Sequence, residues 1–348
     1  MKKIIVALSL ILMLTLTACG SKDNSSKEEI SVYNWGEYID PQILKDFEKE
    51  TGIKVNYSTY ASNEDLYIKM TQSQDQYDVV VPSDYLIERL IKEDLVQEIN
   101  FDNVKNFDTV EDKLKNPVFD PENKYSVPYF WGTMGIVYNK AVINEKLDSW
   151  DALWDKKYEG QIIMYNSQRD TIGLALKRLG YSLNSTDPKE LEEAKKTLIE
   201  QKPLVYAYLD DDGRDVVVQG DANICVMYSG DALNMIEQNP DLDYFIPREG
   251  SNIWYDSMVI PKNAANKEGA EKFIDYMLKP EVQVKNAEYC VGYTSPVKGI
   301  KDKLPENIKN SKVAYPDLET TPPLEAFRDL GEAVKLYDRI WTEISASN

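Results

Sequence analysis

Four short segments place aromatic side chains beside carboxylates at positions where strands are predicted to end. The segments are Trp35-Gly36-Glu37-Tyr38, Ser83-Asp84-Tyr85, Tyr228-Ser229-Gly230-Asp231 and Trp254-Tyr255-Asp256-Ser257. Asp170, just ahead of a predicted helix, could join them. The faces of aromatic rings attract organic cations, and carboxylates give ammonium groups charge-assisted hydrogen bonds. The pattern therefore favours a ligand with amino groups at both ends and methylene groups between them.

Taken singly, these residues have simpler interpretations. A lone Trp or Tyr at a strand end commonly packs in the core or at its rim, and Asp231 and Asp256 would each suit a turn or a helix cap. The functional hypothesis depends on finding four aromatic and acidic groups at comparable positions.

The composition narrows the classes of function. The 348 residues include no His, which excludes a His-dependent catalytic triad and a His-ligated metal site. The formal net charge of −19 would repel a nucleic-acid backbone and suits cationic partners. The sequence has no Gly-rich phosphate-binding motif and no zinc-type Cys spacing. We therefore expect no cofactor, no metal and no nucleic-acid partner.

The first residues are typical of an exported lipoprotein. Lys2 and Lys3 precede an apolar run over residues 4–18, which is too short for a transmembrane span and has the proportions of a secretory leader. The Leu16-Thr17-Ala18-Cys19 sequence resembles the lipobox of bacterial lipoproteins. The resemblance implies that residues 1–18 are a signal peptide and that Cys19 carries a lipid. Residues 19–29 would then tether an extracytoplasmic or periplasmic domain to the outer face of the cell membrane.

Two further cysteines, Cys225 and Cys290, are too few for a disulfide framework. Their neighbours in the sequence are apolar, so we expect both to be buried free thiols.

The first hundred residues alternate between strand and helix patterns. Strands are predicted over residues 30–35, 54–60 and 77–81, and each is followed by an amphipathic stretch. Asp40 can cap the first helix and Gly52 can end it, while Ser62 has the spacing of a capping box. This alternation predicts an α/β fold with a largely parallel sheet, whose ligands bind at the carboxyl ends of the strands.

The rest of the chain continues the same alternation, with no clean linker between two domains. We expect strands over residues 135–139, 160–165, 222–228 and 256–261, and helices over residues 150–156, 171–179, 188–201, 267–278 and 324–340. The missing linker suits two lobes between which the chain crosses more than once.

These segments bring the chain close to a known family. The most specific matches are Asn34-Trp35-Gly36-Glu37-Tyr38, Val81-Pro82-Ser83 and Trp254-Tyr255-Asp256-Ser257. Further matches are Pro128-Tyr129-Phe130-Trp131-Gly132 and Gly292-Tyr293-Thr294-Ser295-Pro296. The sequence resembles the polyamine (spermidine/putrescine) substrate-binding proteins of bacterial ABC importers.

The resemblance implies a two-lobe type II periplasmic-binding-protein fold. Each lobe would be a mixed sheet flanked by helices, with the ligand in the cleft between the lobes. Residues 30–135 and 256–310 would form the first lobe, and residues 136–255 and 311–348 the second. The resemblance also implies a monomeric, non-catalytic carrier that closes around putrescine or spermidine and delivers it to permease subunits.

Individual residues acquire roles from the same resemblance. Asp256 would hold an amino group, and Asp170 stands where relatives place a Glu that contacts the amine. Asp231 is similar to an acid of putrescine-type relatives, whereas spermidine-type relatives can have a neutral residue there. The residues expected to bind ligand are Trp35, Glu37, Tyr38, Ser83, Tyr85, Asp170, Tyr228, Asp231, Trp254, Asp256 and Tyr293.

Two other functions remain open from the sequence. An oligosaccharide carrier of the same fold would bind neutral ligands with little dependence on salt. A glycoside hydrolase could use two carboxylates such as Asp170 and Asp256, one of which should then have a raised pKa. For a polyamine carrier we expect the reverse, because every acid of the site must stay ionised.

Overall fold

The computed structural model describes residues 28–210 and 212–347. The predicted signal peptide, the lipid-attachment residue Cys19 and most of the predicted tether lie outside these residues. Within the described part of the chain, no helix combines the length and the apolar character needed to cross a bilayer.

The first part of the chain alternates strands and helices as predicted. Strand β1 (Glu29–Trp35) pairs in parallel with β2 (Lys54–Tyr60) on one side and β3 (Val79–Val80) on the other. The helices that follow these strands are α2 (Pro41–Thr51), α3 (Asn63–Gln72) and α4 (Asp84–Lys92). Only β3 is clearly shorter than the predicted strand over residues 77–81.

Local chemistry fixes the ends of these helices. The Asp40 carboxylate accepts a hydrogen bond from Gln42 N at 2.8 Å, and Ser62 Oγ accepts one from Asp65 N at 3.1 Å. Gly52 follows α2 with a φ of 76°, a left-handed conformation that glycine adopts without strain. The predicted caps are therefore confirmed.

Two long strands join the two halves of the molecule. β5 (Ser126–Asn139) pairs antiparallel with β10 (Ser251–Pro261). The main path of the sheet runs β2-β1-β3-β10-β5-β8-β6-β7; β4 (Val96–Gln97) and β11 (Leu324–Glu325) add to β10, and β9 (Leu242–Phe245) adds to β5. The sequence predicts only the last part of each long strand, over residues 135–139 and 256–261.

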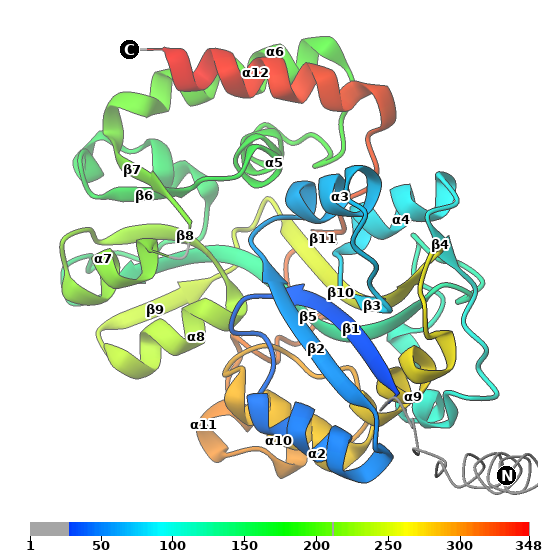
Figure 1. The fold of residues 1–348 in the computed structure, drawn as a ribbon. Helices are drawn as coiled ribbons and strands as arrows, with labels where there is room; N and C mark the ends of the chain where they lie inside the picture. Colours follow the sequence, from blue (N-terminus) through cyan, green and yellow to red (C-terminus); the bar gives the residue numbers. More distant parts are fainter. Residues whose placement is uncertain (1–27, 211, 348) are drawn as a thin grey trace, which may run out of the picture.

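The second half is built on β6 (Ile162–Tyr165), which pairs in parallel with β7 (Val205–Leu209) and β8 (Ile224–Tyr228). The C-terminal helix α12 (Val334–Ala346) packs against α5 (Gln168–Arg178) and α6 (Pro188–Gln201) (Figure 1). The helices between β5 and β10 are η3 (Trp150–Trp154), η4 (Lys156–Tyr158), α5 (Gln168–Arg178), α6 (Pro188–Gln201), η5 (Lys202–Leu204), α7 (Gly213–Gln219) and α8 (Ser229–Gln238).

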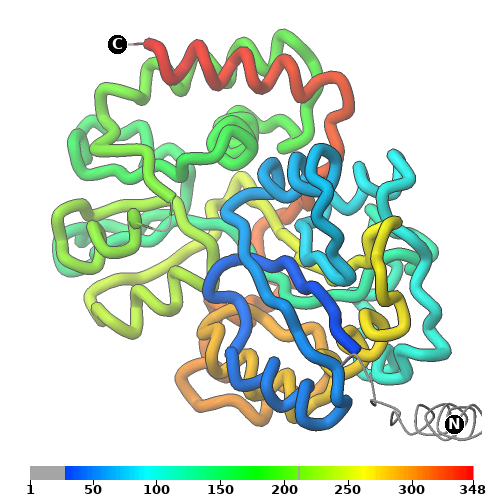
Figure 2. The backbone as a smooth tube through the Cα atoms, viewed as in Figure 1, coloured from blue at the N-terminus to red at the C-terminus, as the bar shows by residue number. Residues whose placement is uncertain are grey.

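The chain returns to the first half after β10. In Figure 2 it can be followed from the blue half to the green half, back through the yellow and orange segments, and finally to the red α12. The remaining helices are η1 (Lys105–Thr109), η2 (Asp112–Leu114), α9 (Lys267–Met277), α10 (Pro280–Tyr289), η6 (Lys301–Lys303), α11 (Glu306–Lys309) and η7 (Gly331–Ala333). This repeated crossing and the mixed sheet confirm the predicted α/β fold class.

The predicted helix over residues 324–340 is wrong in its first half. Residues 326–330 follow β11 without regular structure, and α12 begins only at Val334. Gly331 has a φ of 53°, which interrupts a right-handed helix, and a Glu88 carboxylate oxygen accepts a hydrogen bond from Asp329 N at 2.9 Å. Phe327 and Leu330 are buried all the same, so the apolar spacing that suggested a helix belongs to an irregular segment.

Hydrophobic packing divides between the two halves. Phe47 and Phe273 belong to the core of the first half, and Trp150 and Tyr337 to the core of the second. Cys225 and Cys290 are buried and free, as predicted. Each half thus has its own core, and β5 and β10 connect the two.

Candidate ligand-binding site

Asp256 lies in the interior of β10, not at the end of a strand as predicted. Its carboxylate accepts hydrogen bonds from Tyr38 Oη at 2.8 Å and from Ser83 Oγ at 2.6 Å. The residue is buried, and burial raises its pKa to about 6 even though both hydrogen bonds act to lower it. A carboxylate in this position would be stabilised by a cation.

The strand order brings these three residues together. Ser83 follows β3, which pairs with β10, and an isolated bridge joins Ser83 to Asp256. The pairing of β10 with β5 is irregular between Asp256 and Ser257, as at a β-bulge, a feature that commonly redirects a side chain. Tyr38 follows the carboxyl end of β1, and Tyr129 Oη donates a hydrogen bond to its carbonyl oxygen. The site thus draws on the edge of the sheet at which parallel strands end.

Asp170 forms a second buried acidic position, in the first turn of α5. Ser167 caps this helix, since its Oγ accepts a hydrogen bond from Asp170 N at 3.4 Å. Tyr228 Oη donates to Asp170 Oδ2 at 3.0 Å, and Oδ1 is buried with no hydrogen-bond partner among the described residues. Burial raises the pKa of Asp170, against the opposing effect of hydrogen bonds with Ser167 and Tyr228.

A continuous row of aromatic rings runs between these two acids. Tyr38, which binds Asp256, lies 5.1 Å from Tyr293 between ring centroids, and Tyr293 lies 5.8 Å from Trp254. Trp254 in turn lies 6.1 Å from Tyr228, which binds Asp170. Trp254 Nε1 is buried and has no hydrogen-bond partner among the described residues. The row offers ring faces and edges along the path from one acid to the other.

Two glycines allow the rings of this row to lie directly against the backbone. The Trp254 ring covers Gly132, where an added Cβ would come within 2.5 Å of the indole. A Cβ at Gly230 would meet the Tyr293 ring at 2.7 Å. Any larger residue at Gly132 or Gly230 would therefore displace an aromatic side chain of the site.

Asp231, in the first turn of α8, is the third of the predicted site acids that is buried. Its Oδ1 accepts a hydrogen bond from Arg214 Nη1 at 2.8 Å, and its Oδ2 accepts one from Tyr293 Oη at 3.0 Å. Asp231 thus already has a cationic partner, whereas the donors to Asp256 are the hydroxyl groups of Tyr38 and Ser83.

Trp35 and Tyr85 flank the site rather than joining the row. Trp35 Nε1 donates to Val81 O at 2.9 Å, and Tyr85 Oη donates to a Glu64 carboxylate oxygen at 3.2 Å. Trp35 is the last residue of β1, and Tyr85 lies in the first turn of α4, the helix that follows β3. Glu37 differs, because its side chain is exposed and makes no hydrogen bond to the other predicted site residues within the described chain. The structure therefore does not bring Glu37 into the site.

Comparison with known proteins identifies the family. A profile described as bacterial extracellular solute-binding protein matches residues 42–318. The chain belongs to this family. It is 38% identical over 337 residues to the spermidine/putrescine-binding periplasmic protein of Escherichia coli K12, covering 96% of each chain. It is 32% identical over 358 residues to the putrescine-binding periplasmic protein SpuD of Pseudomonas aeruginosa, covering 97% of each.

Solved structures agree with these relatives. The solute-binding protein is 40% identical, with a TM-score of 0.87, to a spermidine/putrescine ABC transporter protein of Listeria monocytogenes, covering 92% of this chain and 100% of that one. The TM-score is 0.81, also at 40% identity, for a spermidine/putrescine ABC transporter substrate-binding protein of Streptococcus pneumoniae, covering 91% of this chain and 98% of that one. The predicted resemblance to polyamine-binding proteins and the predicted fold are thus confirmed.

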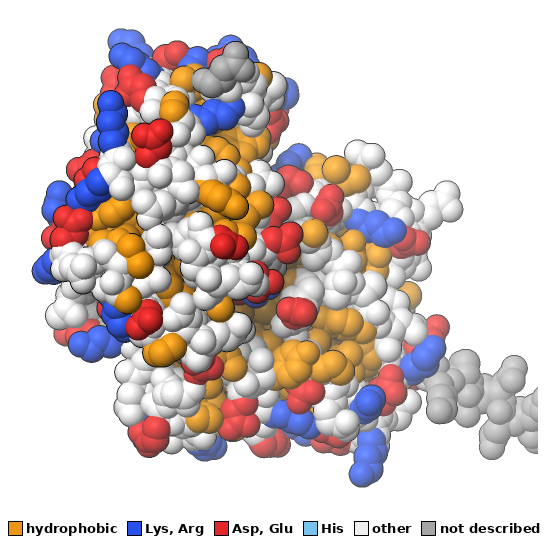
Figure 3. Space-filling view, turned by 90° about the vertical axis from the view of Figure 1, so that its left-hand side faces the viewer, with side chains coloured by type: hydrophobic (Ala, Val, Ile, Leu, Met, Phe, Trp, Pro, Cys, Tyr) orange, Lys and Arg blue, Asp and Glu red, His pale blue; other side chains and the backbone are white. Residues whose placement is uncertain are grey.

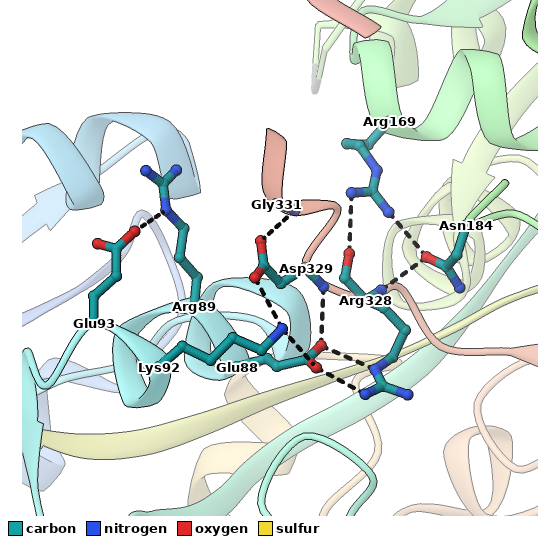
Figure 4. Close-up of polar contacts among 9 residues, drawn as sticks. All are labelled: Glu88, Arg89, Lys92, Glu93, Arg169, Asn184, Arg328, Asp329 and Gly331. Atoms are coloured by element: carbon teal, nitrogen blue, oxygen red, sulfur yellow. Dashed lines mark hydrogen bonds and ion pairs between the residues drawn. The ribbon is translucent and has the colours of Figure 1, made fainter. Parts of the chain in front are cut away.

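The sequence analysis missed a polar network beside Asp170. Arg169 donates hydrogen bonds to Arg328 O at 3.2 Å and to Asn184 Oδ1 at 3.0 Å (Figure 4). The Arg328 guanidinium donates to both carboxylate oxygens of Glu88, at 2.9 and 2.7 Å. Burial opposes ionisation of Glu88, but hydrogen bonds from Arg328, Asp329 N and Lys92 lower its pKa to about 2. The network fixes residues 328 and 329 against α4.

The expectation that no acid of a polyamine carrier has a raised pKa was wrong for this solute-binding protein without a ligand. The pKa of Asp256 is raised to about 6, at which the group is still mostly ionised at neutral pH, and the pKa of Asp170 is raised as well. The physical reason is that burial removes water from these carboxylates, while their hydrogen-bond donors are neutral hydroxyls. A raised pKa therefore does not distinguish a hydrolase from a carrier here.

The chemistry of the site favours an organic cation over a metal. Among the described residues, no group of three or more acidic, Cys or His side chains is placed to hold a metal ion. On the face drawn in Figure 3, acidic side chains are spread over the surface, and several border the hollow near its centre. Buried carboxylates connected by aromatic rings suit a chain of methylene groups that carries ammonium groups.

Proposed function

We propose that this solute-binding protein binds a polyamine, putrescine or spermidine, and delivers it to the permease subunits of an ABC importer. One observation carries the proposal: two buried carboxylates, Asp256 and Asp170, have hydroxyl donors as partners and lie at the two ends of a row of aromatic rings. The names of the relatives, which include spermidine- and putrescine-binding proteins, support the same ligand class.

The ligand would bring a positive charge into direct contact with each of the two carboxylates. An ammonium group about 4 Å from a carboxylate gains about 4 kcal/mol at an effective dielectric constant of about 20, before the cost of desolvation. Tyr38 and Ser83 would keep their hydrogen bonds to Asp256, and a cation would return its pKa toward the usual range of an aspartate. The methylene groups would lie along Tyr293, Trp254 and Tyr228.

Closure of two lobes around the ligand is the second part of the proposal. The first lobe would comprise residues 30–135 and 256–310, and the second residues 136–255 and 311–348. Asp256 then belongs to the first lobe and Asp170 to the second, so a ligand that binds both carboxylates stabilises only the closed arrangement. Ligand binding would therefore shift the population toward the closed form, which is the form presented to the permease.

The remaining parts of the proposal concern the setting in which the carrier works. We propose that cleavage follows residue 18, that Cys19 is lipidated, and that a monomeric, non-catalytic domain is held at the outer face of the cell membrane. The family, whose members are bacterial extracellular solute-binding proteins, supports an extracytoplasmic location.

Calorimetric titration of residues 20–348 tests the ligand class. Putrescine, spermidine and a neutral oligosaccharide are each titrated at low and at physiological salt. We expect saturable one-to-one binding of a polyamine that weakens with salt, because salt screens the long-range attraction between a cationic ligand and a protein whose formal net charge is −19. Heat from the oligosaccharide alone, or from none of the three, would contradict the proposal.

Two substitutions then locate the ends of the ligand. Asp256→Asn and Asp170→Asn each remove one charge and retain the shape of the side chain, and we expect at least about a hundredfold weaker binding for Asp256→Asn and about tenfold for Asp170→Asn. Asp148→Asn is the matched control, because Asp148 pairs with Arg248 on the exposed surface. Equal affinities for all four proteins would show that the ligand lies elsewhere.

A further inference from the structure

The three buried acids of the site do not have the same partners. Asp256 and Asp170 accept hydrogen bonds from the hydroxyl groups of Tyr38, Ser83 and Tyr228. Asp231 accepts a hydrogen bond from the Arg214 guanidinium at 2.8 Å. We infer that Arg214 is a specificity-determining residue, an internal cation at the third acidic position that directs the ligand's terminal ammonium groups to Asp256 and Asp170. This inference rests on the proposed polyamine-binding function.

The position of the ion pair follows from the packing of two short helices. Arg214 is the second residue of α7, and Asp231 lies in the first turn of α8, which packs against α7. The Asp231 side chain is 6% exposed and that of Arg214 is 28% exposed. Positive partial charge at the start of α8 also favours a carboxylate there. Both the helix and the guanidinium therefore stabilise the ionised form of Asp231.

Tyr293 connects this ion pair to the row of rings. Its hydroxyl group donates to Asp231 Oδ2 at 3.0 Å, while Arg214 Nη1 donates to Oδ1. The close approach depends on glycine, because a Cβ at Gly292 would lie 2.5 Å from Gly230 O. Asp231 thus lies beside the middle of the row, where a ligand's internal amine would pass.

The arrangement has a consequence for ligand length and charge. From the sequence we expected the Asp231 carboxylate to be available to an amino group of the ligand, because it resembles an acid of putrescine-type relatives. Because Arg214 already pairs with Asp231, this carboxylate is less available to an amine, whereas the hydrogen-bond donors to the acids at the two ends of the row are hydroxyl groups. An extended ligand with two terminal ammonium groups meets this pattern, and an internal third charge finds no free carboxylate at Asp231.

Removal of the guanidinium tests the inference by titration. Arg214→Gln leaves Asp231 without its countercharge, so we expect spermidine, which carries a third amine, to bind about tenfold more tightly, and putrescine to change less. Adding Asp231→Asn to Arg214→Gln should remove that increase. Arg248→Gln, at an exposed ion pair, is the matched control. Unchanged spermidine affinity in Arg214→Gln overturns the inference. It is also overturned if the double variant binds spermidine more than about tenfold more weakly than the unaltered protein, since Asp231 itself would then hold an amine.

A ligand-free measurement separates this inference from the proposed function. Thermal unfolding of Arg214→Gln, Asp231→Asn and the double variant forms a double-mutant cycle that needs no polyamine. We expect the double variant to lose less Tm than the sum of the two single losses. Additive losses overturn the ion pair as an energetic unit. If the unaltered protein binds neither polyamine, the proposed function fails, and the cycle still decides whether the pair exists.

Discussion

Asp256 and Asp231 are two buried aspartates near the same pair of tyrosines, yet the protein stabilises them by different means. Tyr38 donates to Asp256 and Tyr293 donates to Asp231, and the two rings lie 5.1 Å apart. Asp231 has a guanidinium partner within the chain, whereas the donors to Asp256 are hydroxyl groups. Burial consequently raises the pKa of Asp256 to about 6.

The difference separates an acid that has a countercharge within the fold from an acid kept for a ligand. An internal cation offsets the cost of burying a carboxylate, and removing either partner leaves an isolated charge. A buried carboxylate that lacks a cation costs stability until a ligand supplies one. The site at Asp256 thus stores part of the binding free energy as an unfavourable charge in the ligand-free protein.

The largest expected effect is on the stability of the ligand-free protein. Because the pKa of Asp256 is higher in the folded chain than in the unfolded one, the folded state binds more protons between about pH 4 and pH 6, and stability falls as the pH rises through that range. Asp256→Asn removes this penalty. We expect it to stabilise the ligand-free protein by about 3 kcal/mol at pH 7.5 and by less than about 1 kcal/mol at pH 4.

Urea unfolding of protein refolded without polyamine measures this difference at both pH values. Asp148→Asn, on the exposed surface, should stay within about 0.5 kcal/mol of the unaltered protein at pH 7.5. A destabilised Asp256→Asn variant at pH 7.5 would show that Asp256 resembles Asp231 and already has a favourable charge environment.

The next effect is on the pH dependence of polyamine affinity. An ammonium group pairs with the ionised form of Asp256, so below about pH 6 the carboxyl must first lose a proton. We expect the Kd to rise about fivefold from pH 6 to pH 5, or about tenfold from pH 7 to pH 5, and to level off above pH 7. Calorimetry in buffers of different ionisation enthalpy counts the protons released. Flat affinity over this range, with no proton release, would mean that Asp256 is ionised before the ligand arrives.

Local signals in the sequence were enough to predict much of the fold. Asp40, Ser62 and Gly52 mark helix ends by interactions with their near neighbours, so the chain around them could be interpreted residue by residue. The segment over residues 326–330 could not, because its conformation depends on Glu88, which is 240 residues from Arg328 in the sequence. Apolar spacing alone does not distinguish an irregular buried segment from a helix.

The candidate site was predictable in its residue types but not in its pairings. Asp256 meets Tyr38 and Ser83 only through the sheet, across 218 and 173 residues of sequence. Glu37 has aromatic neighbours in the sequence, as the other acids do. It lies in the loop after β1, where it adopts a φ of 50° and its side chain is exposed. Arg214 stands in an acidic segment with no aromatic neighbour, so nothing in the local pattern marked it as the partner of Asp231.

The smallest expected effect comes from removing one of the hydroxyl groups that donate a hydrogen bond to Asp256. Tyr38→Phe removes one donor to Asp256, and because that hydrogen bond lowers the pKa of Asp256, its loss should move the pH at which affinity levels off upward. We expect about threefold weaker polyamine binding at pH 7, the effect of one modest net hydrogen bond. Tyr129→Phe is the matched control, since Tyr129 Oη donates to the Tyr38 carbonyl and not to an acid of the site. Tyr129→Phe should lower the stability of the protein but leave the pH dependence of polyamine affinity unchanged. If this pH dependence shifts equally in both variants, the effect comes from packing around Tyr38 and not from its hydrogen bond to Asp256.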